Sequence, residues 1–293
     1  MNDGIKLNVG ASPIWEKDGW HTLDHKVRLS QAANSLLGEA SSIPLDNETC
    51  STIFCSHMFE HIPHVELENV LLEFNRVLAK DGIVRILTPN LKKIAEAYVK
   101  NDVNFFASLK KEDVSIRTDL GLGGMFVNFI ISPGQDTALF SKDLKRFIAG
   151  YAHIYCYDFD MLRILLERTG FGNIKEKSFC DSELLDYNEP LHVQGHPAVW
   201  QDFNHEFYIK NNLVHYYDSE TGGYVINFKL TGFDRDPLTS LIVEARKISL
   251  IDKAGYKSLN NEDRNYNRYA FSLLQDHIFA QKLSDIQKLS LKW

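Results

Sequence analysis

Three short apolar segments near the N-terminus each end in a small or polar residue, and this pattern constrains the fold most strongly. They span Ile5–Gly10, Trp20–Asp24 and Ser51–Ser56, and their last residues are a glycine, an aspartate and a serine. The carboxyl ends of parallel strands lie along one edge of a sheet, where open α/β folds bind ligands. The three segments therefore predict one ligand cleft along a single sheet edge.

Segments with helical periodicity alternate with these strands. Apolar spacing predicts helices over residues 27–37, 65–79, 91–100 and 158–169. Further strands are expected at 83–88, 174–179 and 240–246, with a short edge strand near 38–40. Only about ten residues join the first two strands, which is too few for a crossover helix. Alternating strands and helices indicate a largely parallel sheet that is covered on both faces.

Two irregular stretches interrupt the predicted domain. We expect the domain to span residues 1–248, with insertions at about 102–150 and 181–239 that form a lid over the sheet edge. The second insertion is expected to contain a hairpin near Gly222 and Gly223. Residues 249–293 are expected to form a C-terminal helical extension.

Composition narrows the choice of partners. The chain has 293 residues and a formal net charge of −7, which disfavours a nucleic-acid backbone as the main partner. No apolar run approaches the length of about 18 residues that a transmembrane helix needs, so no membrane insertion is expected. The four cysteines form no CxxC motif, and the first strand leaves no room for a signal peptide. A cytoplasmic protein is expected.

Five segments, taken in chain order, resemble the class I S-adenosylmethionine-dependent methyltransferases, and more narrowly their small-molecule type. They are Leu7–Ser12 (LNVGAS), Gly19–Asp24 (GWHTLD), Ile43–Asp46 (IPLD), Ser56–His61 (SHMFEH) and Arg76–Gly82 (RVLAKDG). The resemblance covers residues 5–90 and resumes near 157–171 and at the last strand. It implies a Rossmann-like, doubly wound, mostly parallel seven-stranded sheet with an antiparallel last strand. It also implies S-adenosyl-L-methionine as the cofactor.

Cofactor-binding residues follow from the resemblance and from residue chemistry. Gly10 lets the backbone approach a ligand closely, and Asp24 is placed to accept hydrogen bonds from ribose hydroxyls. The resemblance implies that Glu39 and Ala40 border the adenine. It also implies that Ser56 and His57 line the methionine end of the cofactor. The complete predicted set is Asn8, Gly10, Ala11, Asp24, Glu39, Ala40, Ser56 and His57.

Two departures from the family pattern leave an alternative open. Asn8 stands where the family has an acid, and Ser12 stands where it has a second glycine. A catalytically inactive methyltransferase-like protein, which binds the cofactor or acts as a scaffold, is therefore a second hypothesis. A nicotinamide site is disfavoured because Gly10–Trp15 does not read GxGxxG and no helix is expected to follow it.

The predicted reaction is methyl transfer to an oxygen or nitrogen atom of a small-molecule or saccharide acceptor by in-line displacement. His57 and His153 are the predicted catalytic residues, as candidate bases. Glu60 and His61 are expected to be structural, since an acid in the first turn favours the helix dipole.

No metal site is expected from the sequence. The second insertion contains four histidines and an aspartate that could act as metal ligands. Gly195 and Pro197 disfavour a helix there that would present the ligands on one face. These candidate ligands are His192, His196, Asp202, His205 and His215.

Overall fold

The computed structural model describes residues 4–11, 15, 17–25, 34–107, 120–131, 153–188, 201–202, 210, 214–219, 223–226, 238–252 and 256. The chain divides into two compact units, residues 1–251 and 252–293. The predicted C-terminal helical extension lies outside the described residues, except for 249–252 and 256. The predicted domain boundary and the lid role of the insertions stay predictions.

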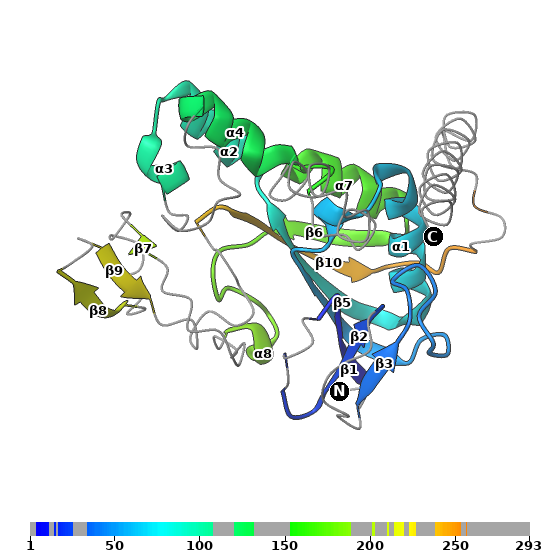
Figure 1. Cartoon of the computed structure of the whole chain (residues 1–293). Coiled ribbons are helices and arrows are strands. Elements are labelled where there is room, and N and C mark those ends of the chain that lie inside the picture. Colours follow the sequence, from blue (N-terminus) through cyan, green and yellow to red (C-terminus); the bar gives the residue numbers. More distant parts are fainter. Residues whose placement is uncertain are drawn as a thin grey trace, which may run out of the picture. The chain divides into compact units, whose positions relative to one another are not determined.

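A seven-stranded sheet forms the centre of the first unit (Figure 1). Its strands are β1 (Ile5–Val9), β2 (Trp20–Asp24), β3 (Ser35–Leu37), β4 (Cys50–Ser56), β5 (Leu78–Pro89), β6 (Phe171–Glu176) and β10 (Ser240–Lys247). They lie in the order β3-β2-β1-β4-β5-β10-β6. β10 is antiparallel to β5 and β6, whereas β1 to β5 pair in parallel. The predicted mostly parallel, seven-stranded sheet with an antiparallel last strand is confirmed.

Helices α1 (His64–Val77) and α7 (Phe159–Arg168) bury their apolar sides against one face of this sheet. Asp158 caps α7, because its carboxylate accepts a hydrogen bond of 2.9 Å from the backbone N–H of Met161. Gly170 follows the helix at φ +87°, a conformation that favours glycine. Both features agree with the sequence prediction for this helix.

The described part of the chain contains five further helical elements. They are the 3₁₀ turn η1 (Phe59–His61), α2 (Leu91–Val99), α3 (Val103–Ala107), α4 (Gly121–Ile131) and α8 (Leu185–Asn188). Residues of α2 and α3 form a small apolar cluster with Cys156, and partly buried side chains of α4 pack against it. Among the described residues, no helix is long and apolar enough to cross a bilayer.

Aromatic side chains cover the opposite face of the sheet near β1 and β4. The described residues between β1 and β2 are not helical, as the short connection predicts. Trp15 and Trp20 instead pack edge to face with ring centroids 5.9 Å apart, and Tyr187 of α8 packs against Trp20 and Phe54. The first residues of the predicted second insertion therefore complete the core.

Some secondary-structure predictions are wrong in part. Ser35–Leu37 pair in parallel with β2 as strand β3, so the predicted helix over 27–37 does not reach its end. Residues 26–33 lie outside the described part. The edge strand consequently lies at Ser35–Leu37, just before residues 38–40, where it was predicted. Adjacent leucines fit either a helix face or a strand, so apolar spacing alone could not decide. β6 begins at Phe171, earlier than predicted, because its pairing with β10 starts directly after Gly170.

A second, three-stranded sheet lies within the predicted second insertion. It contains β7 (Gln201–Asp202), β8 (Val214–Asp218) and β9 (Gly223–Ile226) in the order β7-β9-β8. β8 and β9 are antiparallel, which confirms the predicted hairpin. The structure does not describe His192, His196 or His205, nor the side chains of Asp202 and His215.

Candidate functional site

The predicted cofactor residues lie at the carboxyl ends of neighbouring strands. Gly10 follows β1, Asp24 ends β2, and Ser56 ends β4. β2 and β3 lie on one side of β1, and β4 and β5 lie on its other side. The chain crosses from the first side to the second between β3 and β4. This reversal of strand order is the position at which open α/β sheets bind ligands.

The turn at Gly10 has no room for a side chain. Gly10 has φ +73°, and a Cβ atom there would lie 2.8 Å from the sulfur of Met58. Its backbone N–H donates a hydrogen bond of 2.9 Å to the carbonyl oxygen of Leu23, which ties the turn to β2. Met58 and the positive φ therefore both favour glycine at this position, whereas the predicted approach of a ligand to Gly10 stays a prediction.

The other predicted contacts on this side of the sheet differ in exposure. Asn8 and Ala11 are buried on either side of the turn. The Asp24 side chain is 12% exposed, and its Oδ1 lies 3.7 Å from Nδ1 of His25. Glu39 and Ala40 directly follow β3, where Glu39 is exposed and Ala40 packs against the main core. All five lie within two or three residues of an end of β1, β2 or β3.

Ser56 contributes a buried hydroxyl group. Its Oγ has no hydrogen-bond partner among the described residues. Buried polar atoms are nearly always hydrogen-bonded, and a buried one without a partner costs about 1–3 kcal/mol. The hydroxyl therefore fits a polar ligand group at the end of β4, as the amino-acid end of S-adenosylmethionine would supply.

His57 is held by two side chains. Its Nδ1 lies 3.0 Å from Oε1 of Glu60, and its Nε2 lies 3.0 Å from Oγ of Ser240 at the start of β10. Its backbone is in the left-handed region at φ +49°. Strained residues of this kind persist where the surroundings fix them, and they concentrate at functional sites. The imidazole is thus oriented by groups from η1 and from the last strand.

Glu60 is fully buried at the centre of this region. Burial alone would raise the pKa of its carboxyl, but the hydrogen bond from His57 and the imidazoles of His57, His153 and His61 lower it to about 2. The carboxylate is therefore ionised at neutral pH. Its Oε2 accepts a hydrogen bond of 3.3 Å from the Thr88 hydroxyl.

The structural role expected for Glu60 stays a prediction, and the structure adds contacts that the sequence did not indicate. The carboxylate does not cap a helix, since neither η1 nor α1 has a side-chain cap. It instead holds the side chains of His57 and Thr88. Because the carboxylate is charged, it accepts from Nδ1–H of His57 and leaves Nε2 of that ring as the basic nitrogen.

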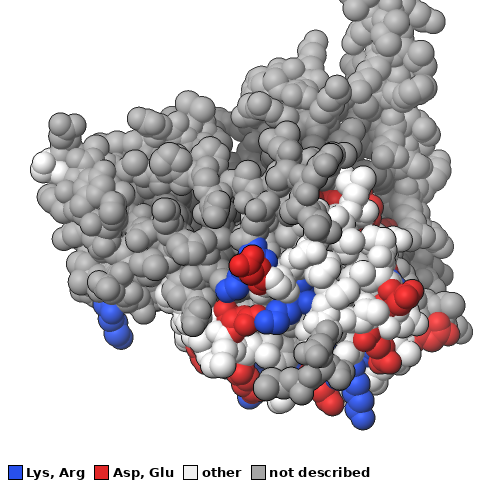
Figure 2. Space-filling view, turned by 90° about the horizontal axis from the view of Figure 1, so that it is seen from below, with Lys and Arg blue, Asp and Glu red and all other residues white. Residues whose placement is uncertain are grey.

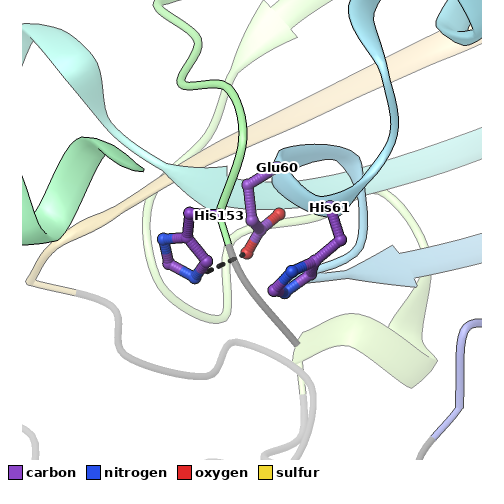
Figure 3. A group of neighbouring side chains, drawn as sticks. All are labelled: Glu60, His61 and His153. Carbon is purple, nitrogen blue, oxygen red and sulfur yellow. Dashed lines mark ion pairs between the residues drawn. The ribbon is translucent and has the colours of Figure 1, made fainter. Parts of the chain in front are cut away.

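His153 and His61 approach Glu60 from two chain segments (Figure 3). Nε2 of His153 lies 4.0 Å from Oε1 of Glu60, and the two imidazole rings are 5.0 Å apart. Nδ1 of His153 lies 3.2 Å from the carbonyl oxygen of Phe129. Burial lowers the pKa of His153 to about 4, against the opposing effect of Glu60, so this imidazole is neutral at neutral pH.

The structure thus brings both predicted catalytic histidines to one carboxylate, and it adds partners that the sequence did not reveal. Ser240, Thr88 and Met58 were not predicted. The spacing of His57 and Glu60 by three residues is a local signal that could have linked them, because such residues face one another across a helical turn. No local signal links His57 to Ser240, which lies 183 residues further along the chain.

One family model matches part of the chain. Residues 16–86 match a family model described as "Methyltransferase domain". The resemblance inferred from the sequence is confirmed for these residues, and by this assignment the cofactor is S-adenosylmethionine. Among curated proteins, no sequence matches the chain.

Solved structures of methyltransferases are also similar. A SAM-dependent methyltransferase from Archaeoglobus fulgidus is 13% identical, with 83% of this chain and 86% of that chain covered and a TM-score of 0.39. An S-adenosylmethionine-dependent methyltransferase from Mesorhizobium loti is 10% identical, with 83% and 90% covered and a TM-score of 0.40.

Proposed function

Residues 16–86 belong to the class I S-adenosylmethionine-dependent methyltransferase domains, and from this premise we propose that the chain methylates an oxygen or nitrogen atom of a small-molecule or saccharide acceptor. One observation carries the proposal. Gly10, Asp24 and the buried Ser56 hydroxyl lie at the ends of three adjacent strands, where the strand order reverses. The family assignment does not identify the acceptor.

The residues at this edge fit the cofactor. Asp24 would accept hydrogen bonds from the ribose hydroxyls, and Glu39 and Ala40 would border the adenine. Ser56 would bind the methionine end, next to the turn at Gly10. When bound, S-adenosylmethionine supplies a methyl group already activated by the sulfonium charge and takes back the electron pair of the broken carbon–sulfur bond.

His57 is the proposed base. An acceptor hydroxyl or amine forms the new bond to carbon and gives its proton to Nε2 of His57, the nitrogen that Glu60 leaves unprotonated. Ser240, whose Oγ lies 3.0 Å from Nε2, orients the imidazole from the other side. His153 is the weaker candidate base because burial depresses its pKa to about 4.

Surface charge supports a small or saccharide acceptor. In the described part of the face drawn in Figure 2, basic side chains lie among acidic ones and form no extended patch of one sign. Exposed pairs such as Lys175 and Glu183, 3.5 Å apart, show the same mixture. A nucleic-acid partner would favour a continuous basic surface.

The cofactor site is tested by calorimetric titration with S-adenosylmethionine and with its demethylated product. The wild-type chain should bind both, and Asp24→Ala should bind at least about tenfold more weakly, since hydrogen bonds to a charged acceptor contribute about 1.5–3 kcal/mol. Asp18→Ala, in an exposed turn, is the matched control and should bind as the wild type does. A flat titration of the folded wild-type chain with both compounds would contradict the proposal.

Methyl transfer is tested with cofactor labelled in its methyl group, at saturating cofactor, against small-molecule and saccharide fractions. His57→Gln should lower kcat at least about hundredfold, the usual contribution of a positioned base. Tight cofactor binding without label transfer to any fraction would favour the inactive, cofactor-binding alternative. Label in a nucleic-acid fraction would contradict the proposed acceptor class.

A further inference from the structure

Three potential metal ligands converge at the end of β4. One ligand atom from each of Glu60, His61 and His153 lies within 4.8 Å of the other two (Figure 3). We propose that these three side chains bind a divalent transition-metal ion of the Zn²⁺ type. The sequence did not predict this site, because Glu60 and His61 are adjacent whereas His153 follows a long insertion.

The tautomer of His153 suits a metal ligand. Its Nδ1 faces the Phe129 carbonyl at 3.2 Å and donates its proton there, so Nε2 carries the lone pair. Histidines that bind metals usually donate their second ring nitrogen to a carbonyl or carboxylate in this way. Nε2 then faces Oε1 of Glu60 at 4.0 Å, which is too long for a hydrogen bond.

That separation is close to what two ligands of one ion require. Zinc–nitrogen and zinc–oxygen bonds of about 2.0–2.2 Å at a tetrahedral angle put two ligand atoms roughly 3.4 Å apart. A movement of about 0.6 Å would close the gap for this pair, and all three ligand atoms lie within 4.8 Å of one another. The Thr88 hydroxyl, which donates to Oε2 of Glu60, would orient the carboxylate during this adjustment.

Backbone hydrogen bonds hold the two ligand-bearing segments together. The N–H groups of Ile154 and Tyr155 both donate to the carbonyl oxygen of Glu60, at 2.8 and 3.3 Å. The N–H of His61 donates to the carbonyl of Met58 within the same turn. The ligand positions are thus fixed by the main chain, and only side chains must move to bind an ion.

Ligand chemistry selects the class of ion. Two imidazoles and one carboxylate suit Zn²⁺ and the neighbouring first-row ions, whereas Mg²⁺ and Ca²⁺ prefer oxygen ligands alone. Glu60 is fully buried, and the two histidines are partly exposed, so an ion would enter from the histidine side. Three protein ligands leave a coordination position open, as in catalytic rather than structural zinc sites.

An open position would have a consequence for the reaction. Because Glu60 also binds His57, an acceptor hydroxyl on the ion would lie near the proposed base, and the ion would lower the pKa of that hydroxyl. This consequence rests on the proposed function. Metal binding itself does not, since it can be measured without cofactor or acceptor.

The test uses the full chain, freed of metal with a chelator and titrated calorimetrically with Zn²⁺. The wild type should bind one equivalent of Zn²⁺ at this site. His61→Gln and His153→Gln should each weaken binding at least about tenfold. Removing a group that only orients a metal ligand already costs about that much affinity, and removing the ligand itself should cost no less. The double variant should lose the site. His64→Gln, a partly buried histidine outside the cluster, is the matched control and should bind normally.

Two results would overturn the proposal. One is a folded, metal-free wild type that takes up no Zn²⁺, and the other is a double variant with wild-type stoichiometry and affinity. If circular dichroism shows that the variants do not fold, absorption spectra of the Co²⁺-loaded wild type identify the type of ligand atom instead. Visible d–d bands without thiolate charge transfer support nitrogen and oxygen ligands, whereas thiolate charge transfer would assign the ion to a cysteine and overturn the site. A chain that binds Zn²⁺ but not S-adenosylmethionine would contradict only the proposed function.

Discussion

Two buried carboxylates, Glu244 in β10 and Glu60 in η1, lie in different surroundings. Glu244 of β10 lies 2.6 Å from the guanidinium of Arg85, which is itself completely buried. Arg85 also donates to the carbonyl oxygen of Asp181 and lies 5.4 Å from the ring centre of Tyr187. Glu60, in contrast, has only imidazoles and a hydroxyl as side-chain partners among those described above.

The difference concerns which partners can change their charge. A guanidinium stays protonated at every physiological pH, so the pair of Glu244 and Arg85 has one charge state. Imidazoles gain or lose a proton near neutrality and can also bind a metal ion. We therefore interpret the Glu244 region as structural and the Glu60 region as responsive. The two regions should separate in their response to substitution and to pH.

The largest effect is expected from breaking the fixed pair. Glu244→Ala leaves Arg85 charged and buried without its partner, and removing one member of a buried ion pair costs about 3–5 kcal/mol. The free energy of unfolding, measured by urea denaturation at neutral pH, should fall by this amount. Glu96→Ala, which removes an exposed partner of Lys100, should change it little.

A double substitution sharpens this prediction. Replacing both partners by apolar residues, as in Arg85→Met with Glu244→Leu, should restore most of the lost stability because no charge then remains buried. If Glu244→Ala proved as mild as Glu96→Ala, the interpretation of this region as a structural ion pair would be wrong.

A smaller effect should come from acid at the second carboxylate. Burial lowers the pKa of His153 from 6.5 to about 4, so between these values the unfolded chain binds a proton that the folded chain does not. This contribution to stability is fully present above pH 6.5 and is lost as the pH falls towards 4. Between pH 7 and pH 5 the loss should be about 2 kcal/mol. Urea denaturation at the two pH values measures it.

The matched comparison is between two histidines. His153→Gln should lose this part of the pH dependence, whereas His25→Gln, at a more exposed position, should keep it. The low pKa of Glu60 acts with the same sign but only below about pH 4.5, since its folded value is about 2. An unchanged pH dependence in His153→Gln would show that other groups cause it.

The sequence was sufficient to predict the parts of this molecule that depend on local pattern. Alternating apolar residues predict β2 and β4 almost to the residue, and the turn chemistry of Gly10 follows from the strand that it ends. These features are set within a few residues of chain. Gly10, Asp24 and Ser56 could therefore be placed at strand ends from local pattern alone.

The surroundings of Glu60 could not be predicted in the same way. They bring together η1, the segment before α7 and the start of β10, which are distant in the chain. Such contacts depend on how helices and strands pack, and no period in the sequence encodes them. The burial of Glu60 was not foreseen either, because a carboxylate at a helix start is usually exposed, whereas this one is enclosed.

The smallest effect on stability, but a specific one on catalysis, is expected from Glu60→Gln. The amide keeps the shape of the side chain and can still accept from Thr88, but it no longer requires the proton of His57 to sit on Nδ1. At saturating cofactor, kcat should fall at least about tenfold, equivalent to about 1.4 kcal/mol, while cofactor affinity stays unchanged. The acidic limb of the pH–rate profile should also shift, which a purely structural role would not cause.

Glu68→Gln, at a buried glutamate of α1 that pairs with Arg168, is the control and should leave the pH–rate profile unaltered. A large loss of thermal stability in Glu60→Gln, with an unchanged pH–rate profile, would make Glu60 a purely structural residue like Glu244.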